Sequence, residues 1–262
     1  SLVVSPKARV RWEFDVFGNS VAYVDFEEQG SELLIESTLL LERYALDEAP
    51  VPLAPMVVPY PFQYDDEARI DLAPWLHVQC EEDRGTVAAW LQTAMPADTG
   101  SSVAVLEAIS AAIHDGLTYN RREEEGVQTP GHTLSTGTGT CRDYAFLFME
   151  AVRQLGFAAR FVTGYLYDPK LDRPDDGAGM TGGGATHAWA EVFVPGGGWI
   201  EFDPTNRIVA GRNLVRVATT RTPSQALPVQ GSYHGSPDLF LGLDVTVTLT
   251  EKTEAAPVAA AG

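Results

Sequence analysis

The fold of this chain is decided by the stretch Gly137-Thr-Gly-Thr-Cys-Arg-Asp-Tyr-Ala-Phe-Leu-Phe-Met-Glu-Ala-Val-Arg-Gln-Leu-Gly156. Apolar side chains recur in its second half at steps of three and four residues, which predicts a helix with one buried face. Thr140 and Asp143 resemble a capping box at the helix start, and Gly156 occupies the place of a left-handed C-cap. We therefore expect Cys141 in the first turn of a buried helix.

This position matters for the chemistry of Cys141. Unpaired backbone N–H groups at a helix start carry a partial positive charge, so a thiolate is favoured there. The same N–H groups can stabilise an oxyanion during acyl transfer. The alternative for a single cysteine is a buried structural role, because free cysteine is among the most buried residue types.

The composition disfavours several classes of protein. The chain has 262 residues, 45% of them hydrophobic and 21% charged, which is typical of a globular protein of one or two domains. Its 36 acidic and 18 basic side chains give a net charge of −18, so we do not expect nucleic-acid binding, which needs clustered Lys and Arg. No apolar run reaches the roughly 18 to 20 residues of a membrane span, so no membrane association is predicted.

The two cysteines, Cys80 and Cys141, limit the redox and metal chemistry. Two cysteines make at most one disulfide, and nothing in the sequence suggests a four-ligand zinc site. We expect two free thiols in a reducing compartment and no metal or cofactor. Since no signal peptide is visible, a cytoplasmic location is expected.

The first 46 residues predict a small antiparallel sheet with one packed and one wet face. Apolar and charged side chains alternate from Arg9 to Phe14, and Gly18-Asn19 marks a turn before a second strand. A third strand is expected within residues 33–41. Five prolines between residues 49 and 62 exclude helix and interior strand, so we place a semi-rigid linker there. Residues 1–62 are thus predicted to be a β domain with its linker.

Two helices are expected before the cysteine. Helical spacing of apolar residues covers 83–95 and 101–117. Residues 119–140 show no periodicity, so we expect a long loop that leads into Cys141.

Strands are expected after the cysteine helix. Composition predicts a strand over 159–167, and a hairpin with a Gly-rich turn pairs 186–194 with 199–204. A last strand is expected over 245–249. The alanine-rich tail, 255–262, is expected to fray.

Three residues in these elements can act together. Cys141 opens a helix, His187 begins one arm of the hairpin, and Asp203 ends the other arm, so antiparallel pairing brings the last two together. A thiol nucleophile needs a base to take its proton, and the base needs a third group to orient it. Taken singly, a histidine on a strand is more often part of the core, and an aspartate before proline more often forms a turn. The combination favours a Cys-His-Asp triad.

At these residues the sequence resembles the bacterial transglutaminase-like proteins, within the transglutaminase-like cysteine protease and transferase superfamily. The resemblance covers residues 65–250, and the stretch from Asp15 to Val21 also resembles the β domain that precedes the core in many members. Four blocks carry it, in family order and spacing: Gly139-Thr-Cys-Arg-Asp-Tyr-Ala145, Ala159-Arg-Phe-Val-Thr-Gly-Tyr165, His187-Ala-Trp-Ala-Glu-Val192 and Gly198-Trp-Ile-Glu-Phe-Asp-Pro-Thr-Asn206.

The resemblance implies an α+β fold. A papain-like core over residues 63–254 would carry the cysteine on a helix packed against an antiparallel sheet, preceded by the small antiparallel β domain. The resemblance also implies Cys141 as the nucleophile, His187 as the base and Asp203 as the group that orients the base. Tyr119 is a candidate for oxyanion stabilisation beside the backbone N–H of Cys141.

Acyl transfer on peptide or glutamine-type amide bonds is the function that these residues favour. Cys141 would form a thioester, which water resolves in a cysteine protease or amidase and a lysine amine resolves in a transglutaminase. The alternative is a non-catalytic transglutaminase-like module that binds proteins. Arylamine acetyl transfer is disfavoured, because no Gly-rich or basic cradle for coenzyme A is visible. A protein or peptide is the expected partner, and the oligomeric state is left open.

Overall fold

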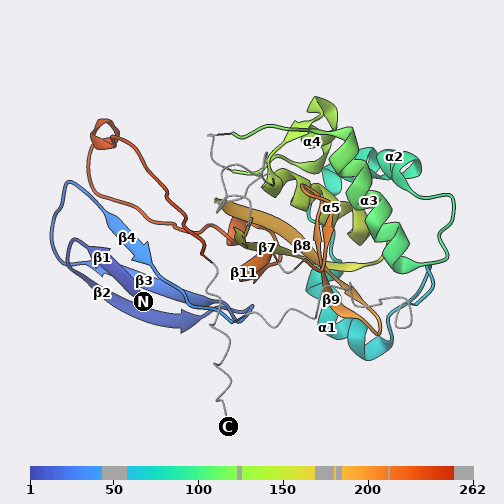
Figure 1. Cartoon of the computed structure of the whole chain (residues 1–262), viewed down its shortest axis with the longest axis horizontal. Helices are drawn as coiled ribbons and strands as arrows, with labels where there is room; N and C mark the ends of the chain where they lie inside the picture. The colour runs from blue at the N-terminus through green and yellow to red at the C-terminus, as the bar shows by residue number, and fades with distance from the viewer. Residues whose placement is uncertain (43–57, 123–125, 169–179, 181–184, 212, 251–262) are drawn as a thin grey trace, which may run out of the picture.

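A five-stranded antiparallel sheet forms the centre of the protein (Figure 1). In the computed structural model, which describes residues 1–42, 58–122, 126–168, 180, 185–211 and 213–250, the strand order is β10-β9-β8-β7-β11. The inner strands are rich in β-branched and aromatic residues, which favour a pleated, buried surface. The five strands span Ala158–Leu166 (β7), Thr186–Val194 (β8), Gly198–Asp203 (β9), Ile208–Val209 (β10) and Leu214–Thr220 (β11).

Helix α5, Cys141–Gln154, packs on one face of this sheet against β7 and β8. Its side chains at Ala145, Phe148 and Val152 are fully buried in the main core. Three further helices pack around α5, namely α2 (Arg84–Ala94), α3 (Ser102–Gly116) and α4 (Pro130–Thr136) (Figure 1). Helix α5 is therefore enclosed on most sides, which fixes the place of its first residue.

Both ends of α5 are as the sequence predicts. The backbone N–H of Thr140 donates to the Asp143 carboxylate at 2.8 Å, which completes the capping box. Gly156 has a φ of +89°, the left-handed conformation that glycine adopts at low cost. Cys141 is the first residue of the helix, as expected.

The expected α+β arrangement of a cysteine-bearing helix on an antiparallel sheet is confirmed. The two helices predicted before the cysteine correspond to α2 and α3, and Ser101 caps α3 by accepting from the N–H of Ala104. The predicted hairpin corresponds to β8 and β9, and the strand expected over 159–167 corresponds to β7.

Two expectations about secondary structure are wrong, and one helix was missed. Residues 119–140 are not one loop, because they contain α4, which starts at Thr129 as N-cap and Pro130 as first residue. They also take part in a short parallel pair of β5 (Thr118–Tyr119) and β6 (Thr138–Gly139). Residues 245–249 form no strand, because no described strand pairs with them. Helix α1 (Asp66–Leu76), capped by Asp65, was not expected.

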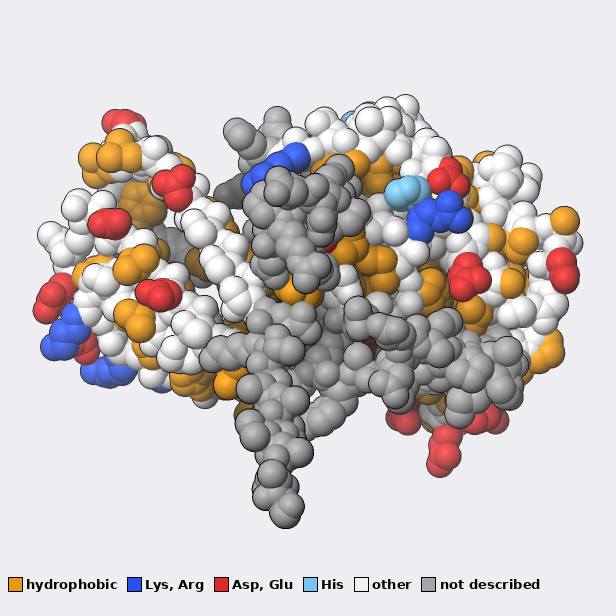
Figure 2. Space-filling view, in the orientation of Figure 1, with side chains coloured by type: hydrophobic (Ala, Val, Ile, Leu, Met, Phe, Trp, Pro, Cys, Tyr) orange, Lys and Arg blue, Asp and Glu red, His pale blue; other side chains and the backbone are white. Residues whose placement is uncertain are grey.

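The N-terminal strands form two separate two-stranded antiparallel sheets, and the third strand expected within residues 33–41 corresponds to β4 (Leu34–Ser37). Neither sheet has a buried face, which corrects the single sheet with one packed face predicted there. Strand β1 (Leu2–Ser5) pairs with β4, and β2 (Ala8–Phe14) pairs with β3 (Ser20–Phe26). Trp12 and Phe14 are 58% and 80% exposed, because no described element covers them. Figure 2 shows apolar side chains reaching the surface over this part.

Two segments with predicted properties lie largely outside the described residues: the proline-rich stretch 49–62 and the tail 255–262. The domain division at residue 62 therefore stays a prediction. Among the described helices, none is both long and apolar enough to cross a bilayer. Short 3₁₀ turns lie at Glu81–Asp83 (η1), Pro223–Gln225 (η3) and Pro237–Leu239 (η4).

Candidate active site

The hairpin brings His187 and Asp203 together, as the sequence predicts. His187 Nε2 and Asp203 Oδ2 lie 2.9 Å apart, and both side chains are fully buried. Strand β8 begins one residue before His187, and β9 ends at Asp203. Antiparallel pairing of these two strands therefore positions the imidazole against the carboxylate.

Asp203 is fixed by two residues whose role the sequence analysis missed. The backbone N–H of Thr205 donates to Oδ1 and Asn206 Nδ2 donates to Oδ2, both at 2.9 Å. Asp followed by Pro, Thr and Asn is a turn-forming sequence in which side chains bond to nearby backbone. That pattern is the signal that could have identified these residues, which hold the carboxylate in one orientation.

Cys141 lies at the start of α5 with 8% of its surface exposed. The Cys141 side chain raises the pKa of His187, so the thiol and the imidazole are neighbours. His187 Nε2 is engaged by Asp203, while Nδ1 has no hydrogen-bond partner among the described residues. Nδ1 is therefore the ring nitrogen left for the thiol.

The buried pair of His187 and Asp203 changes the charge of the imidazole. Burial lowers the pKa of His187, but the charge of Asp203, the hydrogen bond to it and the Cys141 side chain outweigh burial and raise the pKa to about 10. The imidazole is therefore protonated at neutral pH. A protonated imidazole beside a thiol favours the thiolate, which is the nucleophilic form of cysteine.

Tyr119 also lies beside the thiol. Burial, the charge of Cys141 and a hydrogen bond with it raise the pKa of Tyr119 to about 12. The phenol thus keeps its proton at neutral pH and can donate a hydrogen bond. Its ring meets Tyr144 edge-on, with centroids 6.2 Å apart. The structure brings Tyr119 to the site, and its role at an oxyanion stays a prediction.

The segment before the cysteine is held on α5 by Asp143, which the sequence analysis took only as a cap. Its buried carboxylate accepts from Arg122 Nη2 at 3.1 Å and from the backbone N–H of Gln128 at 2.7 Å. Arg122 follows Tyr119 by three residues. The ion pair between Arg122 and Asp143 therefore keeps the Tyr119 segment close to the helix start.

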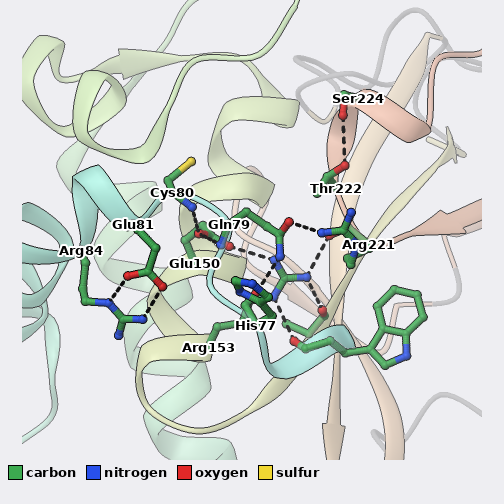
Figure 3. Close-up of polar contacts among 12 residues, drawn as sticks. His77, Gln79, Cys80, Glu81, Arg84, Glu150, Arg153, Arg221, Thr222 and Ser224 are labelled. Atoms are coloured by element: carbon green, nitrogen blue, oxygen red, sulfur yellow. Dashed lines mark hydrogen bonds and ion pairs between the residues drawn. The ribbon is translucent and has the colours of Figure 1, made fainter. Parts of the chain in front are cut away.

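A buried ion pair fixes the far end of the cysteine helix (Figure 3). Arg153 Nη1 donates to Glu150 Oε1 at 2.8 Å, and neither side chain is exposed. Glu150 also accepts from the backbone N–H groups of Gln79 and Cys80, at 2.7 and 2.9 Å. Arg153 donates further to three carbonyl oxygens, those of Trp75, Ala159 and Arg221. This network ties α5 to the segment before α2 and to strand β7.

Cys80, the other free thiol, lies in this network. Burial and then the charge of Glu150 raise the pKa of Cys80 to about 12, so its thiol keeps its proton at neutral pH and is a poor nucleophile. Both cysteines are free, as predicted. Among the described residues, no three His, Cys, Asp or Glu side chains are grouped to hold a metal ion.

Comparison with known proteins relates the part of the chain that contains this site to a known protein family. Residues 91–204 match the model of the transglutaminase-like superfamily, a segment that includes the cysteine, the histidine and the aspartate described above. An uncharacterized protein of Mycobacterium leprae is 34% identical over 126 residues, covering 48% of this chain and 42% of that protein. An uncharacterized protein of Mycobacterium tuberculosis is 30% identical over 150 residues, covering 55% and 47%. The chain thus spans less than half the length of these curated relatives.

A solved structure shares the fold. The chain superimposes on a candidate cysteine protease from Cytophaga hutchinsonii with a TM-score of 0.57 and 20% identity, covering 86% of this chain and 71% of the other. This likeness supports the α+β arrangement. Residues 91–204 thus form a transglutaminase-like domain, and through it the chain is similar to bacterial transglutaminase-like proteins.

Proposed function

We propose that the protein is a thiol-dependent acyl-transfer enzyme that acts on peptide or glutamine-type amide bonds. The observation that supports it is the buried His187, bonded through Nε2 to Asp203 at 2.9 Å, with Nδ1 left for the thiol of Cys141. A base held by a carboxylate beside a thiol at a helix start is the arrangement that activates a cysteine nucleophile.

In the proposed reaction, the proton of Cys141 already resides on His187 Nδ1, and the thiolate sulfur attacks the carbonyl carbon of the amide. The carbonyl oxygen becomes an oxyanion, and the proposed donors that stabilise it are the backbone N–H of Cys141 and the hydroxyl of Tyr119. The tetrahedral intermediate collapses, and the C–N bond breaks. The departing amine takes the proton from His187, and an acyl thioester remains on Cys141.

The second half of the reaction decides between a hydrolase and a transferase. Either water or a lysine amine attacks the thioester and loses a proton to His187. The C–S bond then breaks, the acid or amide product leaves, and the thiolate of Cys141 is restored beside the protonated imidazole. Asp203 keeps the imidazole oriented and stabilises its protonated form in both halves. Its own bonds to Thr205 and Asn206 hold it in place for this role.

The acyl adduct itself provides the test. Purified protein is incubated with a glutamine-containing peptide and with the same peptide carrying asparagine instead, and intact mass is recorded. A glutamine donor predicts an adduct of protein plus peptide minus ammonia. Cleavage of the peptide backbone predicts an adduct of protein plus the N-terminal fragment minus water.

Two cysteine variants serve as controls. Cys141→Ala should abolish every adduct, and Cys80→Ala should leave adduct formation unchanged because Cys80 keeps its proton at neutral pH. Adding a lysine analogue separates the two outcomes, since only a transferase passes the acyl group to the amine. Absence of any adduct and of turnover across a panel of peptides would refute acyl transfer and favour a protein-binding module.

A further inference from the structure

A cavity separate from the cysteine site lies between the β2–β3 turn and the central sheet. Its volume is about 370 Å³, which lies at the small end of the range for small-molecule sites. It is lined by the turn residues Phe17, Gly18, Asn19 and Ser20, by Arg160 of β7, and by Arg216, Val217, Ala218 and Thr219 of β11. Neither Cys141, His187 nor Asp203 lines it.

The walls of this cavity are held in place by hydrogen bonds. Asn19 forms a two-way bond with the backbone of β11, donating from Nδ2 to the oxygen of Thr219 at 2.7 Å and accepting from its N–H at 2.9 Å. Asp15 closes the turn by accepting from the N–H groups of Phe17 and Asn19, each at 2.8 Å. The turn therefore adopts one conformation against the sheet, and the cavity is preformed.

The two arginines of the cavity share one carboxylate. Arg160 Nε donates to Glu191 Oε2 at 2.5 Å, and Arg216 Nη1 donates to Glu191 Oε1 at 3.0 Å. No other polar bond from either guanidinium to a described residue is formed. Each guanidinium carries five N–H donors, so most of the donors of both groups are uncommitted.

The charge around the cavity favours an anion. Its lining contains two guanidinium groups and no carboxylate, although the chain has a net charge of −18. Glu191 lies behind the two arginines and neutralises one of them. Glu201, opposite Glu191 in the β8–β9 ladder, does not line the cavity. Burial lowers the pKa of Arg160, and the charge of Arg216 lowers it as well, whereas the charge of Glu191 and the hydrogen bond to it act in the opposite direction.

We propose that Arg160 and Arg216 form a binding site for an oxyanion, the carboxylate or phosphate group of a small molecule or side chain, in this cavity. Guanidinium groups bind such groups through paired N–H donors, and the bond is stronger in a partly enclosed site than in open water. Ser20 also lines the cavity, and its side chain carries a further hydroxyl donor. The site is independent of the proposed acyl transfer and lies where the β2–β3 turn meets strands β7 and β11.

Calorimetric titration of the whole chain with inorganic phosphate and, separately, with acetate tests the site. The wild-type protein should bind at least one of these anions saturably with a stoichiometry of one, and the stronger of the two identifies phosphate or carboxylate as the natural group. Arg216→Gln should weaken binding at least tenfold. Arg216→Lys should bind the anion with an affinity between those of the wild type and Arg216→Gln, because lysine keeps the positive charge but lacks the paired N–H donors of a guanidinium group.

Arg11→Gln is the matched control. Arg11 lies on β2 with its side chain 54% exposed, against 51% for Arg216, and it is bonded to Glu13 rather than to the cavity. Its substitution should leave the affinity unchanged. Circular dichroism confirms that each variant is folded, and Arg216→Gln leaves the Arg160–Glu191 pair in place. No saturable binding of either anion, or equal affinities of wild type and Arg216→Gln, would overturn the proposal.

Discussion

Replacement of Arg153 by methionine tests how the cysteine helix is held. Methionine keeps much of the volume but removes all four hydrogen bonds of the guanidinium, to Glu150 and to three carbonyl oxygens. The charged Glu150 would then keep only the two backbone donors of Gln79 and Cys80. Breaking a buried ion pair in this way costs about 3–5 kcal/mol, because an uncompensated charge stays in the interior.

Figure 3 contains the matched control. Arg84 and Glu81 form an ion pair at 2.7 Å with the same three-residue spacing as the buried pair, but their side chains are 50% and 57% exposed. Water replaces the lost partner there, so Arg84→Met should leave the free energy of unfolding nearly unchanged. Urea unfolding followed by circular dichroism measures both variants.

A second variant keeps this prediction testable if Arg153→Met is barely folded. Adding Glu150→Gln should recover part of the loss, because an uncharged amide replaces the unpaired carboxylate and still accepts from the two backbone N–H groups. An equal loss of stability in Arg153→Met and Arg84→Met would refute the reasoning. So would a double variant no more stable than Arg153→Met.

Three further predictions concern His187, Gly164 and Tyr119. The pKa of His187 is about 10 in the folded protein and about 6.5 in the unfolded chain, so the protonated imidazole contributes its full stabilisation below pH 6.5 and loses it as the pH rises to 10. The free energy of unfolding, measured with urea, should therefore fall over this range, and it should fall less in Asp203→Asn; equal falls in the two proteins would contradict the prediction. Gly164→Ala should destabilise the protein by about 1–3 kcal/mol, because the added Cβ would clash with the backbone oxygen of Val215. Gly85→Ala in α2, where an added Cβ meets nothing within 4 Å, should not lower thermal stability, and equal melting temperatures of the two variants would contradict this. Tyr119→Phe should lower kcat of the proposed reaction by about 10²–10³ with unchanged unfolding if the phenol binds the oxyanion, and unchanged kcat would exclude it.

The parts of the fold that were predicted correctly depend on local signals. The start of α5 is set by Thr140 and Asp143 and its end by Gly156, all within one stretch of sequence. The hairpin of β8 and β9 follows from alternation around a Gly-rich turn. Because His187 and Asp203 lie on the paired arms, their contact could be predicted before any distance was known.

The misses have physical reasons. Helix α4 is short and lacks a clear apolar stripe, but Thr129 as N-cap and Pro130 as first residue are local signals that could have revealed it. Alternation at Trp12 and Phe14 predicted a packed face, yet burial depends on a covering element that a strand cannot specify alone. The 245–249 stretch has strand composition, but a strand needs a partner, and none of the described strands pairs with it.

The role of Arg122 lay beyond the sequence. Arg122 acts through a contact with Asp143, 21 residues later in the chain, and tertiary packing brings the two side chains together. The cavity with Arg160 and Arg216 likewise depends on two strands and a distant turn meeting in space.

The pH dependence of Cys141 alkylation tests the central claim most directly. Iodoacetamide labelling, located by peptide mass, should modify Cys141 readily at neutral pH, because the imidazole beside it favours the thiolate. Cys80 serves as an internal control and should stay unlabelled there, since its pKa is about 12. In His187→Ala the labelling of Cys141 should slow at neutral pH and rise only near the free-thiol value of about 8.5. The same rate profile in wild type and His187→Ala would contradict the account.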